Sequence, residues 1–168
     1  VPNSPTMTKY CIGGDTAGEG SDFFTGHVLD ARTGQQVATL KQQFDPDEYV
    51  KQMYCLGVYY GNALIGIEAN FDSFPIMELQ RLGYTNQYVR EAQDTYTGRT
   101  EKRFGFKTTS LTRPTIISRL IEIVREDTNS INDKDTLEEL LTIIRNEKGR
   151  IEANFDSFPI MELQRLGY

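Results

Sequence analysis

The segment Ile67–Tyr84 recurs without a single change as Ile151–Tyr168. Packing requires only residues of similar size and polarity, so structural repeats diverge in sequence. Identity at every position therefore indicates a recent duplication or a junction between segments rather than a tandem structural unit. Two identical segments cannot occupy the same place in one sheet. We expect the first copy to belong to the main fold, and we interpret residues 151–168 as an appended tail.

Composition favours a single soluble globular domain. The chain has 168 residues, of which 38% are hydrophobic and 25% charged, as is typical of such domains. No apolar run approaches the length of a transmembrane helix, so we expect no membrane association. Residues 1–8 lack the features of a signal peptide and contain Pro2 and Pro5, which favours a linker. We therefore assign residues 9–150 to the domain and expect Cys11 and Cys55 to be reduced core thiols.

The charge of the chain is unevenly distributed. The net charge of −6 argues against strong general affinity for nucleic acid. Residues 99–119 are nevertheless basic, with Glu101 as the single acid among six basic residues. The residues predicted to bind DNA are Lys102, Arg103, Lys107 and Arg113. The alternative interpretation is an ordinary solvated surface.

Apolar patterning predicts an α/β domain. Strands are predicted at residues 9–14, 23–30, 36–44 and 63–68, the first three forming an antiparallel meander. Helices are predicted at residues 46–60, 73–82, 114–126 and 135–149, with Asp45 as the cap of the first. Residues 84–107 favour a strand and a hairpin. Mixed strands and helices in this order indicate an α/β fold.

The last two predicted helices each carry an apolar stripe that we expect to face the core. In the first of these helices the stripe consists of Ile116, Ile117, Leu120, Ile121 and Val124, and in the second of Leu137, Leu140, Leu141 and Ile144.

Two acidic residues end predicted buried strands. Asp15 follows the first apolar run, and Glu68 ends the run that begins at Ala63. If these strands are neighbours, both carboxylates emerge at one edge of the sheet, where α/β proteins bind ligands. Carboxylate oxygens with room for water suit Mg²⁺ or Mn²⁺, which can promote phosphoryl displacement. The alternative is structural, with Asp15 capping a turn and Glu68 pairing with an arginine.

Other catalytic chemistries find little support in the sequence. The glycine-rich stretch from Gly13 to Gly20 lacks the Gly-Lys-Ser/Thr ending of a nucleotide-binding loop, and Glu19 would repel phosphate. His27 is the single histidine, and its place within a strand favours a packing role. A Ser-His or Cys-His nucleophile is therefore not expected.

Four segments, in order, carry a resemblance to a known family. YCIGGDTAGEGSDFF at residues 10–24 is similar to the first strand of the nuclease domain of tailed-phage large terminase subunits. Residues 67–91 resemble the second acidic motif of that family, a Glu followed two residues later by Asn. Residues 104–126 and 135–150 resemble later segments. The resemblance implies a ribonuclease-H-like mixed sheet, an antiparallel meander plus parallel strands, flanked by helices.

The resemblance also implies an activity. It indicates a two-metal endonuclease that cuts concatemeric viral double-stranded DNA during genome packaging. Asp15 and Glu68 would then be catalytic and hold two Mg²⁺ or Mn²⁺ ions, with Asn70 and Asp22 in support. The implied partners are a packaging ATPase domain, the portal and the small terminase subunit. The implied location is the host bacterial cytoplasm.

The resemblance breaks off after Arg150. The family continues from there to a His-Asp-Asp motif that supplies a third carboxylate, whereas this chain continues into the duplicated segment. Glu152 and Asp156 lie in that segment, but no spacing argument places either of them on the metals. The alternative function is therefore a catalytically incomplete DNA-binding or assembly module of the packaging motor. A sugar-kinase-like phosphotransferase would need a second glycine-rich loop, which the sequence lacks.

Overall fold

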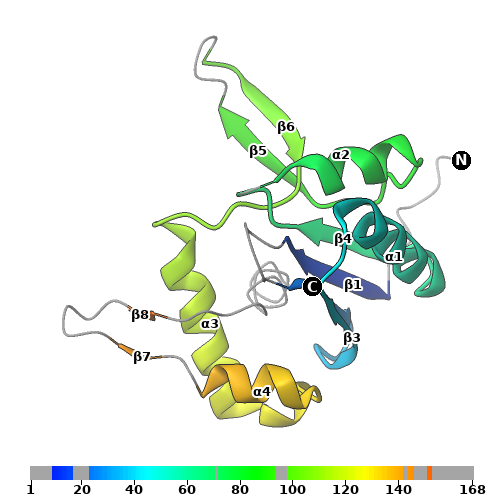
Figure 1. Ribbon diagram of the computed structural model, residues 1–168. Helices are drawn as coiled ribbons and strands as arrows, with labels where there is room; N and C mark the ends of the chain where they lie inside the picture. Colours follow the sequence, from blue (N-terminus) through cyan, green and yellow to red (C-terminus); the bar gives the residue numbers. More distant parts are fainter. Residues whose placement is uncertain are drawn as a thin grey trace, which may run out of the picture.

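The fold is built on a four-stranded mixed sheet (Figure 1). The computed structural model describes residues 9–16, 23–70, 72–93, 98–141, 144–145 and 151–152. The strands of the sheet, in spatial order, are β3 (Gln36–Gln42), β2 (Phe24–Asp30), β1 (Tyr10–Asp15) and β4 (Leu64–Ile67). The first three form the antiparallel meander, and β4 runs parallel to β1. This arrangement confirms the predicted mixed sheet.

Helices cover both faces of the sheet. The helices are α1 (Pro46–Tyr59), α2 (Phe74–Arg81), α3 (Thr112–Glu126) and α4 (Lys134–Leu140), with a short 3₁₀ turn η1 (Thr128–Ser130) before α4. Side chains alternate between the faces of a strand. Met53 of α1 therefore packs beside Val28 in one core cluster, whereas His27 of β2 faces α4. The helix-flanked α/β prediction is confirmed.

The main core lies between the sheet and the helices α1 and α2. Its fully buried side chains come from β1, β2, β4, α1 and α2 and include Ile12, Val28, Tyr49, Met53, Ile65 and Leu79. The helix α1 forms as predicted, although the side chain of Asp45 makes no capping hydrogen bond. The backbone oxygen of Asp45 instead accepts from the amides of Glu48 and Tyr49. Cys11 is buried, but Cys55 is exposed, so the prediction for Cys55 was wrong.

Two short antiparallel ribbons project from this body (Figure 1). The first consists of β5 (Val89–Gln93) and β6 (Thr100–Phe104), and the second of β7 (Ile144–Arg145) and β8 (Ile151–Glu152). Residues 1–8, predicted as a linker, and residues 153–168 of the repeat lie outside the described residues. Among the described helices, none combines the length and the apolar character needed to cross a bilayer.

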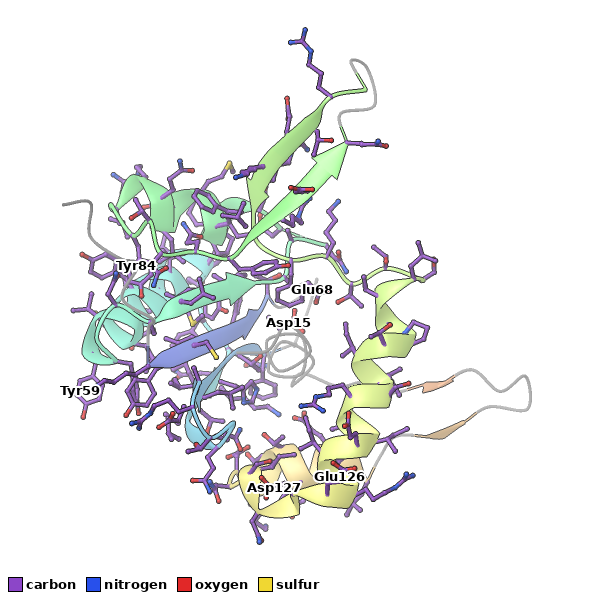
Figure 2. All side chains as sticks on the ribbon, turned by 180° about the vertical axis from the view of Figure 1, so that it is seen from behind. Asp15, Tyr59, Glu68, Tyr84, Glu126 and Asp127 are labelled. Carbon is purple, nitrogen blue, oxygen red and sulfur yellow. The ribbon has the colours of Figure 1, made fainter. Side chains whose placement is uncertain are left out.

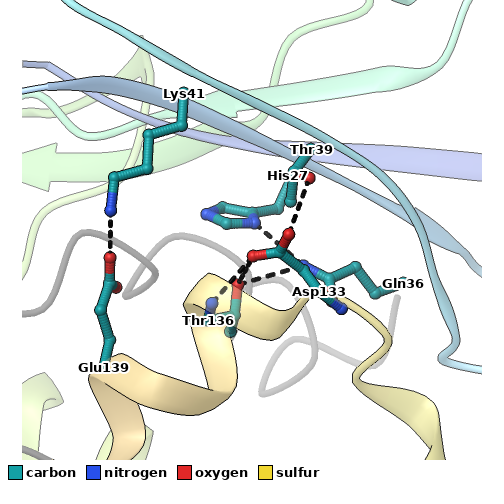
Figure 3. Close-up of polar contacts among 7 residues, drawn as sticks. All are labelled: His27, Gln36, Thr39, Lys41, Asp133, Thr136 and Glu139. Carbon is teal, nitrogen blue, oxygen red and sulfur yellow. Dashed lines mark hydrogen bonds and ion pairs between the residues drawn. The ribbon is translucent and has the colours of Figure 1, made fainter.

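Gln36 joins the sheet to the start of α4 (Figure 3). Its Oε1 accepts the backbone N–H groups of Asn132 at 3.1 Å and Asp133 at 2.9 Å. Its Nε2 lies 3.1 Å from His27 Nδ1. Because the two backbone donors identify the oxygen end of the amide, Gln36 donates to Nδ1, and neutral His27 carries its proton on Nε2. Within the described residues, that Nε2 has no hydrogen-bond partner.

The remaining contacts of α4 with the sheet are also polar (Figure 3). Asp133 caps the helix by accepting from the Thr136 amide at 2.8 Å, and it also accepts from Thr39 Oγ1 at 3.3 Å. Lys41 of β3 forms an ion pair with Glu139. These side chains and His27 line a polar cavity of about 230 Å³. Hydrogen bonds, rather than leucine packing, therefore determine which side of α4 faces the sheet.

The predicted apolar stripes of the last two helices were partly wrong, and for α4 the polar attachment explains the difference. Leu137 is 37% exposed and Leu141 84% exposed, and α4 ends at Leu140, so Ile144 lies in β7 instead of a helix. In α3 the buried residues are Ile116, Ile117, Leu120 and Ile123. Ile121 and Val124 are exposed by 40% and 38%. The buried stripe of α3 is therefore narrower than its apolar pattern.

The buried histidine predicts a pH dependence of stability. Burial lowers the pKa of His27 from 6.5 to about 4, against a smaller raising effect of Asp133. Above pH 6.5 the imidazole is neutral in both the folded and the unfolded chain. As the pH falls towards 4, the unfolded chain binds a proton that the folded chain does not. The free energy of unfolding should then fall by about 1.4 kcal/mol per pH unit, roughly 3 kcal/mol in all.

Denaturant unfolding of the wild type and of His27→Gln across this pH range measures the effect. The stability difference between the two proteins should shrink as the pH falls, because only the wild type loses the histidine contribution. Since the chain has one histidine, its imidazole proton resonances in NMR give a direct check. A titration midpoint near 6.5 in the folded protein would contradict the prediction.

Candidate metal centre

Asp15 and Glu68 lie side by side at the carboxyl ends of neighbouring parallel strands (Figure 2). Gly14 of β1 is the register partner of Ile67 of β4, so the next residues along the two strands are Asp15 and Glu68. The Glu68 amide donates to the Gly14 carbonyl at 2.9 Å, which continues the pairing to this position. Residues at matching register in paired strands project from the same face. The two carboxylates therefore share one face and one edge of the sheet.

Packing behind β1 determines the position of Asp15. A Cβ added at Gly14 would collide with the Tyr49 hydroxyl and lie 2.8 Å from Met53 Cε. Only glycine lets α1 approach the strand this closely. The Tyr49 hydroxyl donates to the Thr25 carbonyl at 2.8 Å, and burial, with the added charge of Asp15, raises the pKa of Tyr49. α1 therefore supports the strand end that carries Asp15.

Glu68 is buried and held by a neighbouring amide. The side chain of Asn70 donates to Glu68 Oε1 at 2.6 Å and to the Thr108 carbonyl at 2.9 Å. Glu68 itself is only 7% exposed. In the structural alternative Glu68 would pair with an arginine, but the partner that the structure gives it is Asn70. The contact fixes one carboxylate oxygen and leaves Oε2 as a candidate ligand.

The segment after β6 completes this edge of the sheet. Phe106 forms a parallel β-bridge with Glu68. The Phe106 amide donates to the Ile67 carbonyl at 3.1 Å, and the Phe106 carbonyl accepts from the Ala69 amide at 2.9 Å. Gly105 precedes it with φ of +78°, and a Cβ there would collide with Ile76. Glycine is therefore required where the chain turns from the β5–β6 ribbon into the sheet.

The donor set suits a magnesium ion that keeps several of its water ligands. Mg²⁺ is commonly held by one or two carboxylates, with water or substrate phosphate completing the octahedron. Thr16, next to Asp15, is 5% exposed, and its buried Oγ1 has no partner within the described part of the chain. Among the described residues, no group of three or more His, Cys, Asp or Glu side chains could hold a metal. The acids at the end of α3, Glu126 and Asp127, lie well away from the pair (Figure 2).

Comparison with known proteins gives matches by structure alone. No family model and no curated protein matches the sequence. The large terminase nuclease of the thermophilic phage G20c with bound magnesium superposes with a TM-score of 0.65 at 19% identity, over 93% of this chain and 80% of that one. A second structure of the G20c nuclease gives a TM-score of 0.62 at 21% identity, over 95% and 80% of the two chains. The nuclease domain of the Thermus phage P74-26 large terminase gives 0.62 at 22%, over 95% and 77%.

The chain has the fold of phage large terminase nucleases. This result confirms the structural expectation drawn from the four sequence segments. At these identities the likeness establishes the fold, and the terminase nuclease fold does not by itself determine what the carboxylates do.

The predicted DNA-binding residues occupy three places on this terminase nuclease fold. Lys102 and Arg103 are exposed on β6, and Lys107 directly follows the Phe106 bridge to Glu68. Arg113 lies in the first turn of α3, where its amide donates to the Thr109 carbonyl at 2.9 Å. Of these four residues, Lys107 is the one that directly follows the backbone pairing with Glu68.

Some contributors to the site could not be named from the sequence. The Thr108 carbonyl reaches Asn70 only because the segment after Phe106 lies against the sheet edge. Thr16 was adjacent to a candidate ligand, yet nothing in the sequence marked its hydroxyl as buried. Asn70 was expected in support of Glu68 and lies in contact with it. Asp22 and Asp156 lie outside the described residues, as does the side chain of Glu152.

Replacing Asn70 with alanine should weaken binding of Mg²⁺. Without the 2.6 Å hydrogen bond the Glu68 side chain is free to rotate, and removal of such an orienting partner typically costs about 10- to 100-fold in metal affinity. Calorimetric titration with Mg²⁺ measures the change. Asn86→Ala is the matched control, because Asn86 also donates to a backbone carbonyl, that of Asn62, but on the surface. Equal Mg²⁺ affinity of the two variants would contradict the proposed role of Asn70.

Proposed function

We propose that this chain is a metal-dependent endonuclease domain that cuts concatemeric viral double-stranded DNA during genome packaging. The observation that carries the proposal is the placement of Asp15 beside Glu68 at the ends of β1 and β4. The terminase nuclease fold supports it, as does the magnesium bound by the G20c nuclease. A packaging ATPase domain, the portal and the small terminase subunit would be its partners, in the host bacterial cytoplasm.

The residues at this edge of the sheet would have separate roles in phosphodiester hydrolysis. Two divalent ions, Mg²⁺ or Mn²⁺, would supply an activated water and stabilise the attacking and leaving oxygens. Asp15 and Glu68 would hold them through carboxylate oxygens, and Asn70 would keep Glu68 in the ligating orientation. Lys107 would hold a phosphate near the scissile bond. Contacts of this kind read the DNA backbone, so cleavage should depend little on base sequence.

The second candidate is a catalytically incomplete DNA-binding or assembly module of the same motor. It is favoured by the absence, among the described residues, of a third carboxylate beside Asp15 and Glu68. With two acidic ligands, less negative charge is available to hold a second ion. Such a module would bind DNA and leave it intact.

Cleavage of supercoiled plasmid by the purified chain, in Mg²⁺ and in Mn²⁺, tests the proposal. The wild type should nick plasmid in Mn²⁺, and Asp15→Asn or Glu68→Gln should lower the rate by more than about 100-fold, since even orienting partners of metal ligands cost up to that factor. Glu126→Gln is the matched control, because it neutralises an exposed carboxylate far from the pair (Figure 2).

The same assay separates the two candidates. DNA binding by the wild type without nicking at any Mn²⁺ concentration would favour the assembly module. Nicking that survives in Glu68→Gln would refute the metal-ligand role of Glu68.

Charge reversal of Lys102, Arg103 and Lys107 to glutamate should weaken binding to duplex DNA. The slope of log affinity against log salt should flatten by about 0.9 for each phosphate that the protein no longer neutralises. Fluorescence anisotropy of labelled duplex at several salt concentrations measures both quantities. Reversal of Arg32, Lys51 and Arg81, which are exposed and paired with acids, changes the net charge equally and serves as the control. An unchanged salt slope would show that these residues are not part of the DNA interface.

A further inference from the structure

Two arginines oppose each other on the β5–β6 ribbon. Arg90 of β5 and Arg103 of β6 are direct register partners. Side chains at opposed positions of an antiparallel pair project from the same face, with their Cβ atoms close together. Like charges in that arrangement destabilise the pairing. The charged pair Glu91 and Lys102, one step along, is instead complementary and lies on the other face.

Arg90 is left without full compensation for its burial. Its Nε is buried and, within the described part of the chain, has no hydrogen-bond partner. Burial, and then the charge of Arg103, lower the pKa of Arg90. Arg103 is paired with Glu101, with Nη2 at 3.1 Å from Oε2. The face formed by Arg90, Arg103 and Glu101 therefore carries two guanidinium groups and one carboxylate, a net charge of +1.

An anion with several acceptor oxygens would satisfy this face. Guanidinium groups present planar sets of N–H donors that match phosphate oxygens, and two of them can share one phosphate. The ribbon also projects from the body of the domain (Figure 1), and a two-stranded ribbon is narrow enough to approach a DNA groove. The β5–β6 pair is separate from the four-stranded sheet, Arg103 is exposed and Arg90 is partly exposed, so a duplex could reach both arginines.

We propose that Arg90 and Arg103 together grip one backbone phosphate of duplex DNA. This assignment rests on the proposed function and adds to it a second point of contact away from the carboxylates. The base of the ribbon is attached to the metal edge, because Gly105 donates to the Tyr88 carbonyl at 2.8 Å and Phe106 donates to the Ile67 carbonyl. A phosphate held by the ribbon is therefore held at a set distance from Glu68. The grip positions the duplex and takes no part in the chemistry.

The test compares DNA affinity and thermal stability in Arg90→Gln. Duplex binding is measured by anisotropy without divalent metal, so that no cleavage intervenes. Affinity should fall about tenfold or more, and the salt slope should flatten by about one. The melting temperature of the free protein should stay the same or rise, because the opposed charge and the unpaired buried donor are removed. Arg81→Gln, which changes the charge equally on the surface of α2, should leave DNA affinity near that of the wild type.

Two further variants sharpen the result. Glu101→Gln removes the carboxylate that competes for Arg103 and should strengthen DNA binding. Arg90→Lys keeps the charge without the planar donors, so it should retain the salt slope and lose affinity. If Arg90→Gln does not fold, the DNA affinities of Arg90→Lys and Glu101→Gln test the proposal without it.

The outcomes separate this inference from the proposed function. Equal affinity of Arg90→Gln and Arg81→Gln, or a lower melting temperature of Arg90→Gln with unchanged binding, would show a purely structural role for Arg90 and overturn the inference. Arg90-dependent binding by a wild type that never nicks DNA would support the grip while refuting the nuclease activity.

Discussion

The parallel pairing of β1 with β4 is the contact on which the candidate metal centre depends. It brings together two carboxylates that are far apart in the sequence, and the Glu68 amide continues it to the last position before the loop. A slip of one residue would turn one carboxylate to the opposite face of the sheet. Ile12 and Ile65 oppose such a slip, because they are register partners and both are buried. The core that stabilises the sheet thus also positions the candidate ligands.

The same edge couples the site to the β5–β6 ribbon. Phe106 is hydrogen-bonded on both sides of Glu68, and Asn70 reaches across to the Thr108 carbonyl. The chain can make this approach because Gly105 adopts a positive φ where a side chain would strike Ile76. Binding of DNA on the ribbon and orientation of Glu68 therefore share one short stretch of backbone. A substitution at Gly105 should disturb both, although it touches neither a phosphate nor a metal ligand.

Features with local causes could be predicted from the sequence, and features with distant partners could not. The ends of β1 and β4, and hence Asp15 and Glu68, follow from apolar runs that stop at an acid. The orientation of α4 does not, because it is determined by Gln36, nearly a hundred residues away in the chain. The leucine pattern alone therefore predicted that Leu141 faces the core, whereas Leu141 is exposed. The opposition of two arginines on the ribbon likewise requires the register of a hairpin, which a charge count does not contain.

The repeated segment shows why identical residues need not share a role. Ile67 and Glu68 lie against β1 in parallel, with Gly14 beside them. Ile151 and Glu152 begin the second copy, yet they pair in antiparallel fashion with Arg145 and Ile144 in the two-residue strand β8. The first copy continues into α2, whose Ile76 and Leu79 are buried in the core. A carboxylate can act as a metal ligand only if its neighbours complete the site. Here that neighbour is Asp15, at the end of β1. The edge of β1 that pairs with β4 is already occupied by the first copy. Sequence identity alone is therefore no reason to assign Glu152 the role proposed for Glu68.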